Sequence, residues 1–143
     1  MNRSPGQRST RERLLHAALE QFAERGFDGV SIASIADDLR LSKQALLHHF
    51  ASKEKLYGEL LARISQEFEA RVNALDAGEA DIASLADLLL ELAAHSRAHR
   101  QQTALLMREL LDNRRRAQRV AHWYLRNFLD LLAERVLGLP LWH

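Results

Sequence analysis

Proline is almost absent from the interior of this chain, and that feature constrains the fold most. Only Pro5 and Pro140 occur among the 143 residues, and both lie near the ends. Proline breaks helices more strongly than any other residue, so nothing between these positions forbids helix. Apolar residues recur at spacings of three and four, whereas no stretch of useful length alternates as a strand does. The pattern predicts an all-α fold.

Composition narrows the class of protein. Apolar residues make up 47% of the chain, which is enough for a hydrophobic core and too much for a disordered chain. Cysteine is absent, which excludes disulfide frameworks and thiolate metal sites. The sequence contains no run of about 18 apolar residues, and its polar, basic N-terminus lacks the apolar core of a signal peptide. We therefore expect a cytoplasmic protein.

Helix starts can be placed from capping residues. Serine and threonine are favoured N-caps because their side-chain oxygens accept hydrogen bonds from the free amides of the first turn. On this basis four helices are expected to begin after caps at Thr10, Ser31, Ser42 and Ser52. Gly26 should end the first helix, Arg40-Leu41 should separate the second from the third, and the third should run to about His49.

The C-terminal part is expected to be helical as well. Ala77-Gly78 interrupts the pattern, and Asp81 is placed to cap a fifth helix. The apolar positions of that helix are Ile82, Leu85, Leu89 and Leu92. From Gln101 the helical pattern continues to about Leu137, with Asp112-Asn113 as the expected break. The last segment is apolar on more than one face, so it needs two packing partners, in the chain or in another subunit.

The second and third helices have the proportions of a helix-turn-helix. In this motif the second of the two helices enters the major groove and reads bases with its N-terminal residues. Such a helix buries one narrow stripe and leaves the rest of its surface free. The stretch "RLSKQALLHHF", Arg40 to Phe50, fits this description, because Leu46 and Phe50 share one face and polar side chains surround them.

Four motifs then occur in order between Leu14 and Leu61: "AALEQFAERGF", "SIASIA", "LSKQALLHHF" and "SKEKL". Together they resemble the DNA-binding domain of the TetR family of bacterial repressors. The resemblance implies a DNA-binding domain at 1–52, made of a basic arm and three helices, and a helical effector-binding and dimerisation domain at 53–143. The basic residues of the arm are Arg3, Arg8, Arg11 and Arg13. The second domain is expected to be incomplete, because family members normally continue for further helices.

The motif and the resemblance together predict nine DNA-binding positions. Lys43 and Gln44 open the third helix and are expected to read base edges, since lysine suits guanine and glutamine suits adenine. His48 and His49 are expected at phosphates or at a neighbouring base, and Lys53 matches the phosphate-binding lysine of the family. The full set is Ser31, Ser42, Lys43, Gln44, Ala45, Leu47, His48, His49 and Lys53, in which the two serines cap helix ends that can hold phosphates.

Three positions depart from the family pattern. Leu47 stands where the family usually has a tyrosine that reaches a phosphate, and Ala45 stands where threonine is common. The turn often carries glycine where this chain has Arg40. If Arg40 adopts a positive φ, the strain is expected to be about 1 kcal/mol relative to glycine.

Candidate sites outside the motif are less specific. The residues that could line an effector pocket are His95, His99, Met107, Trp123, Tyr124 and Phe128, although core packing explains the aromatic ones equally well. His95 and His99 share a helix face, but a metal site needs a third ligand such as His122 or Glu91, so no metal or other cofactor is predicted. The sequence contains no glycine-rich phosphate loop and no Gly-x-Ser-x-Gly elbow, so no enzymatic activity is expected.

The expected function is that of a ligand-responsive repressor that binds a palindromic DNA operator as a homodimer and responds to a small-molecule effector. Its two recognition helices would lie about one DNA turn apart, roughly 34–36 Å. Two alternatives stay open. One is a helical interaction protein in which the motif is only scaffold, which the missing tyrosine, threonine and glycine favour. The other is a metal- or haem-binding bundle built on His95 and His99.

Overall fold

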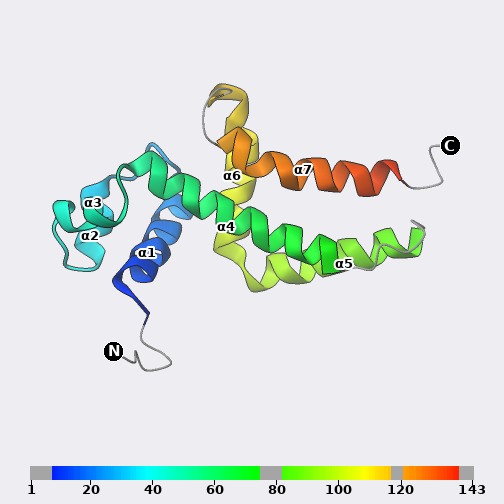
Figure 1. Ribbon diagram of the computed structural model, residues 1–143, viewed down its shortest axis with the longest axis horizontal. Helices are drawn as coiled ribbons and strands as arrows, with labels where there is room; N and C mark the ends of the chain where they lie inside the picture. The colour runs from blue at the N-terminus through cyan, green and yellow to red at the C-terminus, as the bar shows by residue number, and fades with distance from the viewer. Residues whose placement is uncertain (1–7, 75–81, 117–120, 139–143) are drawn as a thin grey trace. The chain divides into compact units, whose positions relative to one another are not determined.

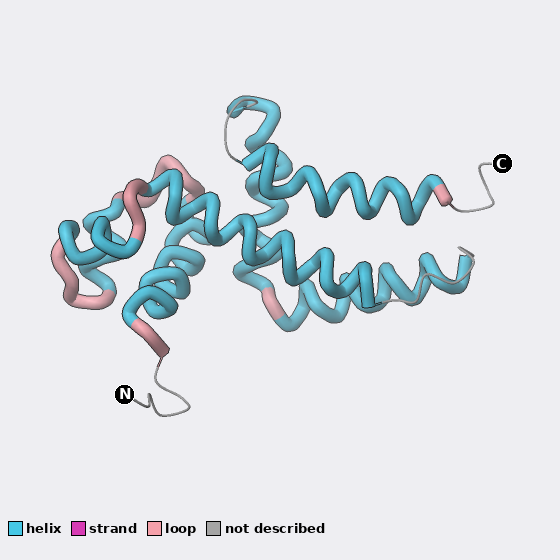
Figure 2. The backbone as a smooth tube through the Cα atoms, viewed as in Figure 1, coloured by secondary structure: helices cyan, strands magenta, loops and turns pink. Residues whose placement is uncertain are grey.

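The computed structural model describes residues 8–74, 82–116 and 121–138 (Figure 1). Over these ranges the chain forms helices and no strand (Figure 2), which confirms the all-α prediction. The helices are α1 (Thr10–Arg25), α2 (Ile32–Asp38), α3 (Lys43–His49), α4 (Lys53–Ala74), α5 (Ile82–Ala98), α6 (Arg100–Arg116) and α7 (Ala121–Leu137). None of these described helices is long and apolar enough to cross a membrane.

The chain divides into two compact units, Met1–Leu60 and Leu61–His143. The boundary falls inside α4, so the first two turns of that helix belong to the N-terminal unit. The functional boundary expected after residue 52 stays a prediction.

The N-terminal cap of α1 differs from the prediction. Ser9, rather than Thr10, caps the helix, because its side-chain oxygen accepts from Glu12 N at 3.2 Å and its backbone is extended. Thr10 is already the first helical residue. Both residue types are good caps, so the sequence pattern alone does not separate two neighbouring candidates. Gly26 ends α1 as predicted, with φ at 76° and its N–H donating to Phe22 O at 2.8 Å.

The other three predicted caps of the N-terminal unit are confirmed. Ser31 and Ser34 form a reciprocal capping box at the start of α2. The Ser42 side chain accepts from Ala45 N at 3.1 Å at the start of α3, and Ser52 accepts from Lys55 N at 3.1 Å at the start of α4. Because α2 and α3 have seven residues each, they are too short to be stable as isolated helices. Caps and tertiary packing hold them in place.

An aromatic cluster forms part of the core of the N-terminal unit. The ring of Phe22, on α1, lies 5.0 Å from that of Tyr57, on α4, and 6.0 Å from that of Phe27. Phe27 and Tyr57 also meet edge to face at 5.0 Å. Leu14 and Leu46 are fully buried as well. Burying one such side chain contributes about 1.5–3 kcal/mol, so this core anchors α3 even though α3 itself is short.

In the C-terminal unit α5 runs alongside the second half of α4 (Figure 1). The Phe68 ring on α4 meets the His95 ring on α5 edge to face at 4.9 Å. The buried face of α5 differs from the predicted one, because Leu88 is buried whereas Leu89 is 58% exposed. Leu85 and Leu92 are half-buried. Adjacent leucines at 88, 89 and 90 allow several helical stripes, so the sequence does not select the face that packs.

The expected break at Asp112-Asn113 is wrong, since α6 continues through both residues to Arg116. Aspartate and asparagine cost only a few tenths of a kcal/mol in a helix interior, and such propensities are weak priors. The expected interruption at Ala77-Gly78 and the expected cap at Asp81 lie outside the described residues. Along α4 the residues Leu56, Leu60, Ile64 and Phe68 follow one another at a spacing of four, and all are at most 5% exposed.

Candidate nucleic-acid interface

A tight turn joins α2 to α3. Its backbone is fixed by hydrogen bonds from Leu41 N to Ala36 O at 2.9 Å and from Arg40 N to Asp37 O at 3.0 Å. Arg40 adopts φ 55°, in the left-handed region that favours glycine. Arg40 therefore meets the condition under which the sequence predicted a strained turn. The strain of about 1 kcal/mol is tolerated because the hydrogen bonds on both sides fix the path of the chain.

Helix α3 is anchored at both ends and on one face. Ser42 caps its start, Leu46 is fully buried, and Phe50, which follows the helix, is 3% exposed. Phe50 N also donates to Leu46 O at 3.0 Å, which closes the last turn. A seven-residue helix with these anchors has a fixed rotation about its axis. The faces that it presents to solvent are therefore defined.

The predicted base-reading residues lie on an exposed face of α3. Lys43 and Gln44 are exposed in its first turn, and His48 is exposed one turn later. The positions that depart from the family pattern, Ala45 and Leu47, are both half-buried. The His48 and His49 rings meet at 5.7 Å. The N-terminal turn of α3 thus presents one cationic side chain and one carboxamide, the groups that suit guanine and adenine edges.

Lys53 has partners inside its own unit. Its ammonium donates to Phe27 O at 2.8 Å and to Val30 O at 2.9 Å, and it lies 4.2 Å from the centre of the Phe27 ring. An ammonium has three N–H donors, so two of them hold the loop between α1 and α2. Sequence reasoning assigned this lysine to phosphate and missed its role in the loop, because carbonyl partners leave no sequence signal.

Arg11 has a role that the basic arm did not suggest. Its guanidinium makes two hydrogen bonds to the Glu59 carboxylate, both at 2.6 Å. It also lies 4.5 Å from the centre of the Phe50 ring. Such forked pairs are stronger than single contacts, so Arg11 joins α1, the end of α3 and α4.

Of the other arm residues, Arg8 and Arg13 line a surface hollow of about 410 Å³ between α1 and α2, and Arg3 lies outside the described residues.

A buried carboxamide joins α1 to α2. Gln21 is 6% exposed, and its Nε2 donates to Ser34 O at 3.0 Å and to Asp38 Oδ2 at 2.7 Å. The Ser34 hydroxyl lies 2.7 Å from Gln21 Oε1 and 2.8 Å from Ser31 O, so its single proton is shared between the two. Sequence reasoning missed this network. The available signal was a polar residue at helical spacing on the face that buries Ala18 and Phe22.

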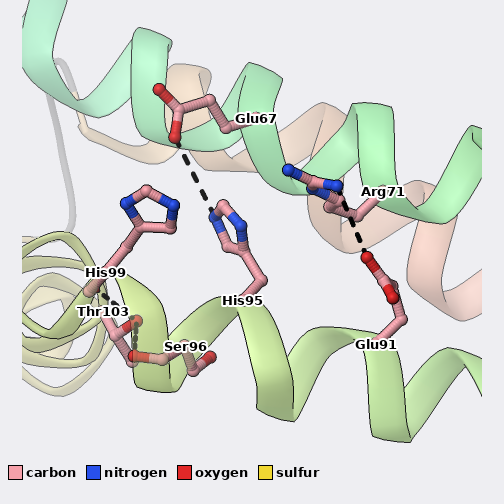
Figure 3. Close-up of polar contacts among 7 residues, drawn as sticks. All are labelled: Glu67, Arg71, Glu91, His95, Ser96, His99 and Thr103. Atoms are coloured by element: carbon pink, nitrogen blue, oxygen red, sulfur yellow. Dashed lines mark hydrogen bonds and ion pairs between the residues drawn. The ribbon is translucent and has the colours of Figure 1, made fainter.

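Two of the predicted effector residues come together in the C-terminal unit. The ring of His95, on α5, lies 4.5 Å from the ring of His99, which stands between α5 and α6 (Figure 3). The His95 side chain is 3% exposed, and its Nε2 lies 3.9 Å from Glu67 Oε2, too far for a hydrogen bond. Burial lowers the pKa of His95, and the charges of His99 and Arg71 lower it further, whereas Glu67 and Glu91 raise it. The arrangement holds His95 neutral near neutral pH.

Of the other effector candidates, the structure describes the side chain of Met107 alone. Met107 is 49% exposed on α6, and the side chains of Trp123, Tyr124 and Phe128 lie outside what the structure describes. In the described part of the chain, no group of three histidine or carboxylate side chains has a spacing that suits a metal ion. His122 and the predicted pocket as a whole remain a prediction.

The N-terminal unit has the geometry of a DNA-binding domain. Two short capped helices cross at a fixed turn, a first helix packs behind them, and the second short helix presents exposed polar side chains from its first turn. These features define a helix-turn-helix protein. Residues 14–60 match the family model described as bacterial regulatory proteins of the tetR family, so this part of the chain is similar to the DNA-binding domains of that family.

Curated relatives agree with this assignment. The chain is 45% identical over 62 residues to the HTH-type transcriptional repressor KstR2 of Mycobacterium tuberculosis, covering 43% of this chain and 31% of that protein. It is 31% identical over 109 residues to the HTH-type transcriptional regulator RutR of Escherichia coli K12, covering 76% and 51%. The chain thus spans about a third to a half of the length of these relatives.

Solved structures extend the likeness beyond the DNA-binding domain. The structure of KstR2 from Mycobacterium tuberculosis matches 93% of this chain and 66% of its own, with a TM-score of 0.73 and 28% identity. A tetR family transcription regulator from Shewanella sp. PV-4 matches 90% of this chain and 69% of its own, with a TM-score of 0.68. At 24% identity, that second likeness concerns the fold alone.

Proposed function

We propose that this chain is a DNA-binding transcriptional regulator, acting in the cytoplasm as a ligand-responsive repressor without enzymatic activity. The observation that carries the proposal is α3, whose buried side fixes its rotation while Lys43 and Gln44 stay exposed in its first turn. Lys43 and Gln44 read base edges. Ser31, Ser42, His48 and His49 contribute contacts near the DNA backbone, and Ala45 and Leu47 fill the positions between them.

Lys53 can serve DNA through its third N–H donor while the other two hold the loop. This double role is consistent with its half-buried position and with the match to the phosphate-binding lysine of the family. Phosphate contacts orient a protein on the duplex, whereas base contacts specify the sequence.

The proposed active form is a homodimer on a palindromic operator, because two recognition helices then engage two half-sites. Exposed leucines on the C-terminal unit support a further protein contact, since Leu129 is 43% exposed and Leu137 is 63% exposed on α7. A small-molecule effector would bind in the same unit. His95 and His99 are its proposed polar contacts.

A salt titration tests DNA binding directly. Duplexes are selected from a randomised pool with the wild-type chain, and their affinity is followed by fluorescence anisotropy as the salt concentration rises. Several phosphate contacts should make the logarithm of the affinity fall linearly with the logarithm of the salt concentration. Weak binding to every duplex with no salt dependence would favour a helical interaction protein instead.

A further inference from the structure

We propose that Gln21 is a positioning residue of the DNA-binding unit: its carboxamide fixes the place of α2 along α1, and thereby the presentation of α3. The inference rests on the proposed function, because positioning matters only if α3 reads DNA. Gln21 is far in sequence from α3 and is only 6% exposed, so its effect on DNA is expected to act through α2.

Apolar packing alone does not fix α2 with the accuracy that base reading needs. The buried residues of α2 are Ile32, Ile35 and Ala36. The buried apolar residues of α1 are Leu14, Leu15, Ala17, Ala18 and Phe22. Hydrophobic attraction is non-directional, so apolar burial holds the two helices together without itself specifying one position of α2 along α1. Functional side chains must be held within about 0.5 Å of their productive place, which calls for directional contacts.

Gln21 supplies those contacts at both ends of α2. Its Nε2 reaches Ser34 O in the first turn and Asp38 Oδ2 at the last residue of the helix. Its Oε1 faces the Ser34 hydroxyl. One side chain therefore fixes α2 both along its axis and in rotation about it.

The turn passes this placement on to α3. Asp38 is the last residue of α2, and the backbone bonds from Arg40 N to Asp37 O and from Leu41 N to Ala36 O tie the turn to the end of that helix. Two residues after Leu41, α3 begins with Lys43 and Gln44. A shift of α2 along α1 would therefore displace the base-reading side chains.

A structural role and a positioning role predict different results for Gln21→Leu. Leucine has a similar volume, and replacing a hydrogen-bonded group by an apolar one can be nearly neutral when no buried partner is left unpaired. That condition holds here, because Asp38 is exposed to water and the Ser34 carbonyl lies within α2. The variant should fold, yet lose the directional contacts.

The test compares two affinities for each variant at one salt concentration. A duplex selected by the wild-type chain from a randomised pool is compared with a scrambled duplex of the same length. Gln21→Leu should weaken binding to the selected duplex about tenfold, the scale of a lost hydrogen-bond network, and leave the scrambled duplex within about twofold. The matched control is Gln66→Leu, at an exposed position of α4, which should change neither affinity.

Asp38 provides the second arm of the test. Asp38→Asn keeps an acceptor for Gln21 Nε2 and should retain the ratio of the two affinities. Asp38→Ala should lower the ratio, and combining it with Gln21→Leu should add little, because both remove the same contact. If circular dichroism shows that Gln21→Leu does not fold, the comparison of Asp38→Ala with Asp38→Asn tests the positioning role.

The outcomes separate the two claims. Suppose that the wild-type chain prefers the selected duplex to the scrambled one. If folded Gln21→Leu or Asp38→Ala then has the same ratio of these two affinities as wild type, the positioning role is overturned and the proposed function stays intact. A wild-type chain that selects no sequence overturns the proposed function, and the positioning role falls with it.

Discussion

At the scale of single residues, Arg40 is the position where the chain departs most from what backbone sterics favour. Its φ of 55° suits glycine, so Arg40→Gly should raise the free energy of unfolding by up to about 1 kcal/mol. Arg40→Ala keeps the strain and is the control. Urea denaturation followed by circular dichroism measures both, and a glycine variant no more stable than the alanine variant would contradict the strain argument.

Gln44 tests base reading. Gln44→Ala should relax the preference at one operator position and cost about 1–3 kcal/mol of binding there. The residue is exposed, so stability should not change. Anisotropy titrations against duplexes with single base changes give the measurement. Equal losses on all duplexes would remove Gln44 from the base-reading set.

Lys53 should affect both stability and binding. Lys53→Ala removes two hydrogen bonds to carbonyls and the contact with Phe27, so the free energy of unfolding should fall by about 1–3 kcal/mol. It should also weaken all DNA roughly equally and reduce the salt slope by about one if the third donor reaches a phosphate. Lys55, exposed on the same helix, provides the matched control as Lys55→Ala. An altered sequence preference would reverse the roles assigned to Lys53 and Gln44.

At the scale of elements, the cap of α3 carries a measurable share of stability. Ser42→Ala removes the acceptor for Ala45 N and should cost about 0.5–2 kcal/mol, whereas Ser42→Asn keeps an acceptor and should cost little. Hydrogen exchange resolves where the loss occurs. The exchange rates of amides in α3 should rise more than those of amides in α4. An equal rise in exchange rate throughout the N-terminal unit would mean that the cap supports the whole unit.

The elements also show what sequence can and cannot predict. Ser31, Ser42 and Ser52 were recognisable as caps because capping is local and depends on a few neighbouring residues. The buried face of α5 could not be predicted from the sequence, since Leu88, Leu89 and Leu90 offer equivalent stripes and only tertiary packing selects one. Long-range polar contacts left the weakest signal: Arg11 with Glu59, 48 residues apart, and Gln21 with Asp38, 17 residues apart, join side chains that no local pattern relates.

At the scale of the whole molecule, the C-terminal unit should lose stability in acid. The pKa of His95 is lowered by burial, and then by His99 and Arg71, whereas in the unfolded chain it has its ordinary value of 6.5. Below that pH the unfolded chain binds the proton more readily, so stability is present above it and is lost as the pH falls. Thermal melts across this range should show a steeper loss for wild type than for His95→Leu; identical slopes would exclude His95 as the cause.

The exposed leucines of α7 bear on assembly. If Leu129 and Leu137 contact a second copy, light scattering across a dilution series should give the mass of a dimer, and the double change to glutamate should give a monomer. Exposed glutamates on the helix surface should leave the secondary structure unchanged. A wild-type monomer at all concentrations would remove the homodimer from the proposal.

The ties between Arg11 and Glu59 and between Lys53 and the loop before α2 also set a rule for hybrid regulators. Both ties close within Met1–Leu60, and Tyr57 completes the aromatic cluster from the same stretch of α4. A junction at residue 52 would remove Lys53, Tyr57 and Glu59 and so break each of these contacts. A chimera joined to a foreign regulatory domain beyond Leu60 keeps all of them, so residues 8–60 should retain their operator preference in it.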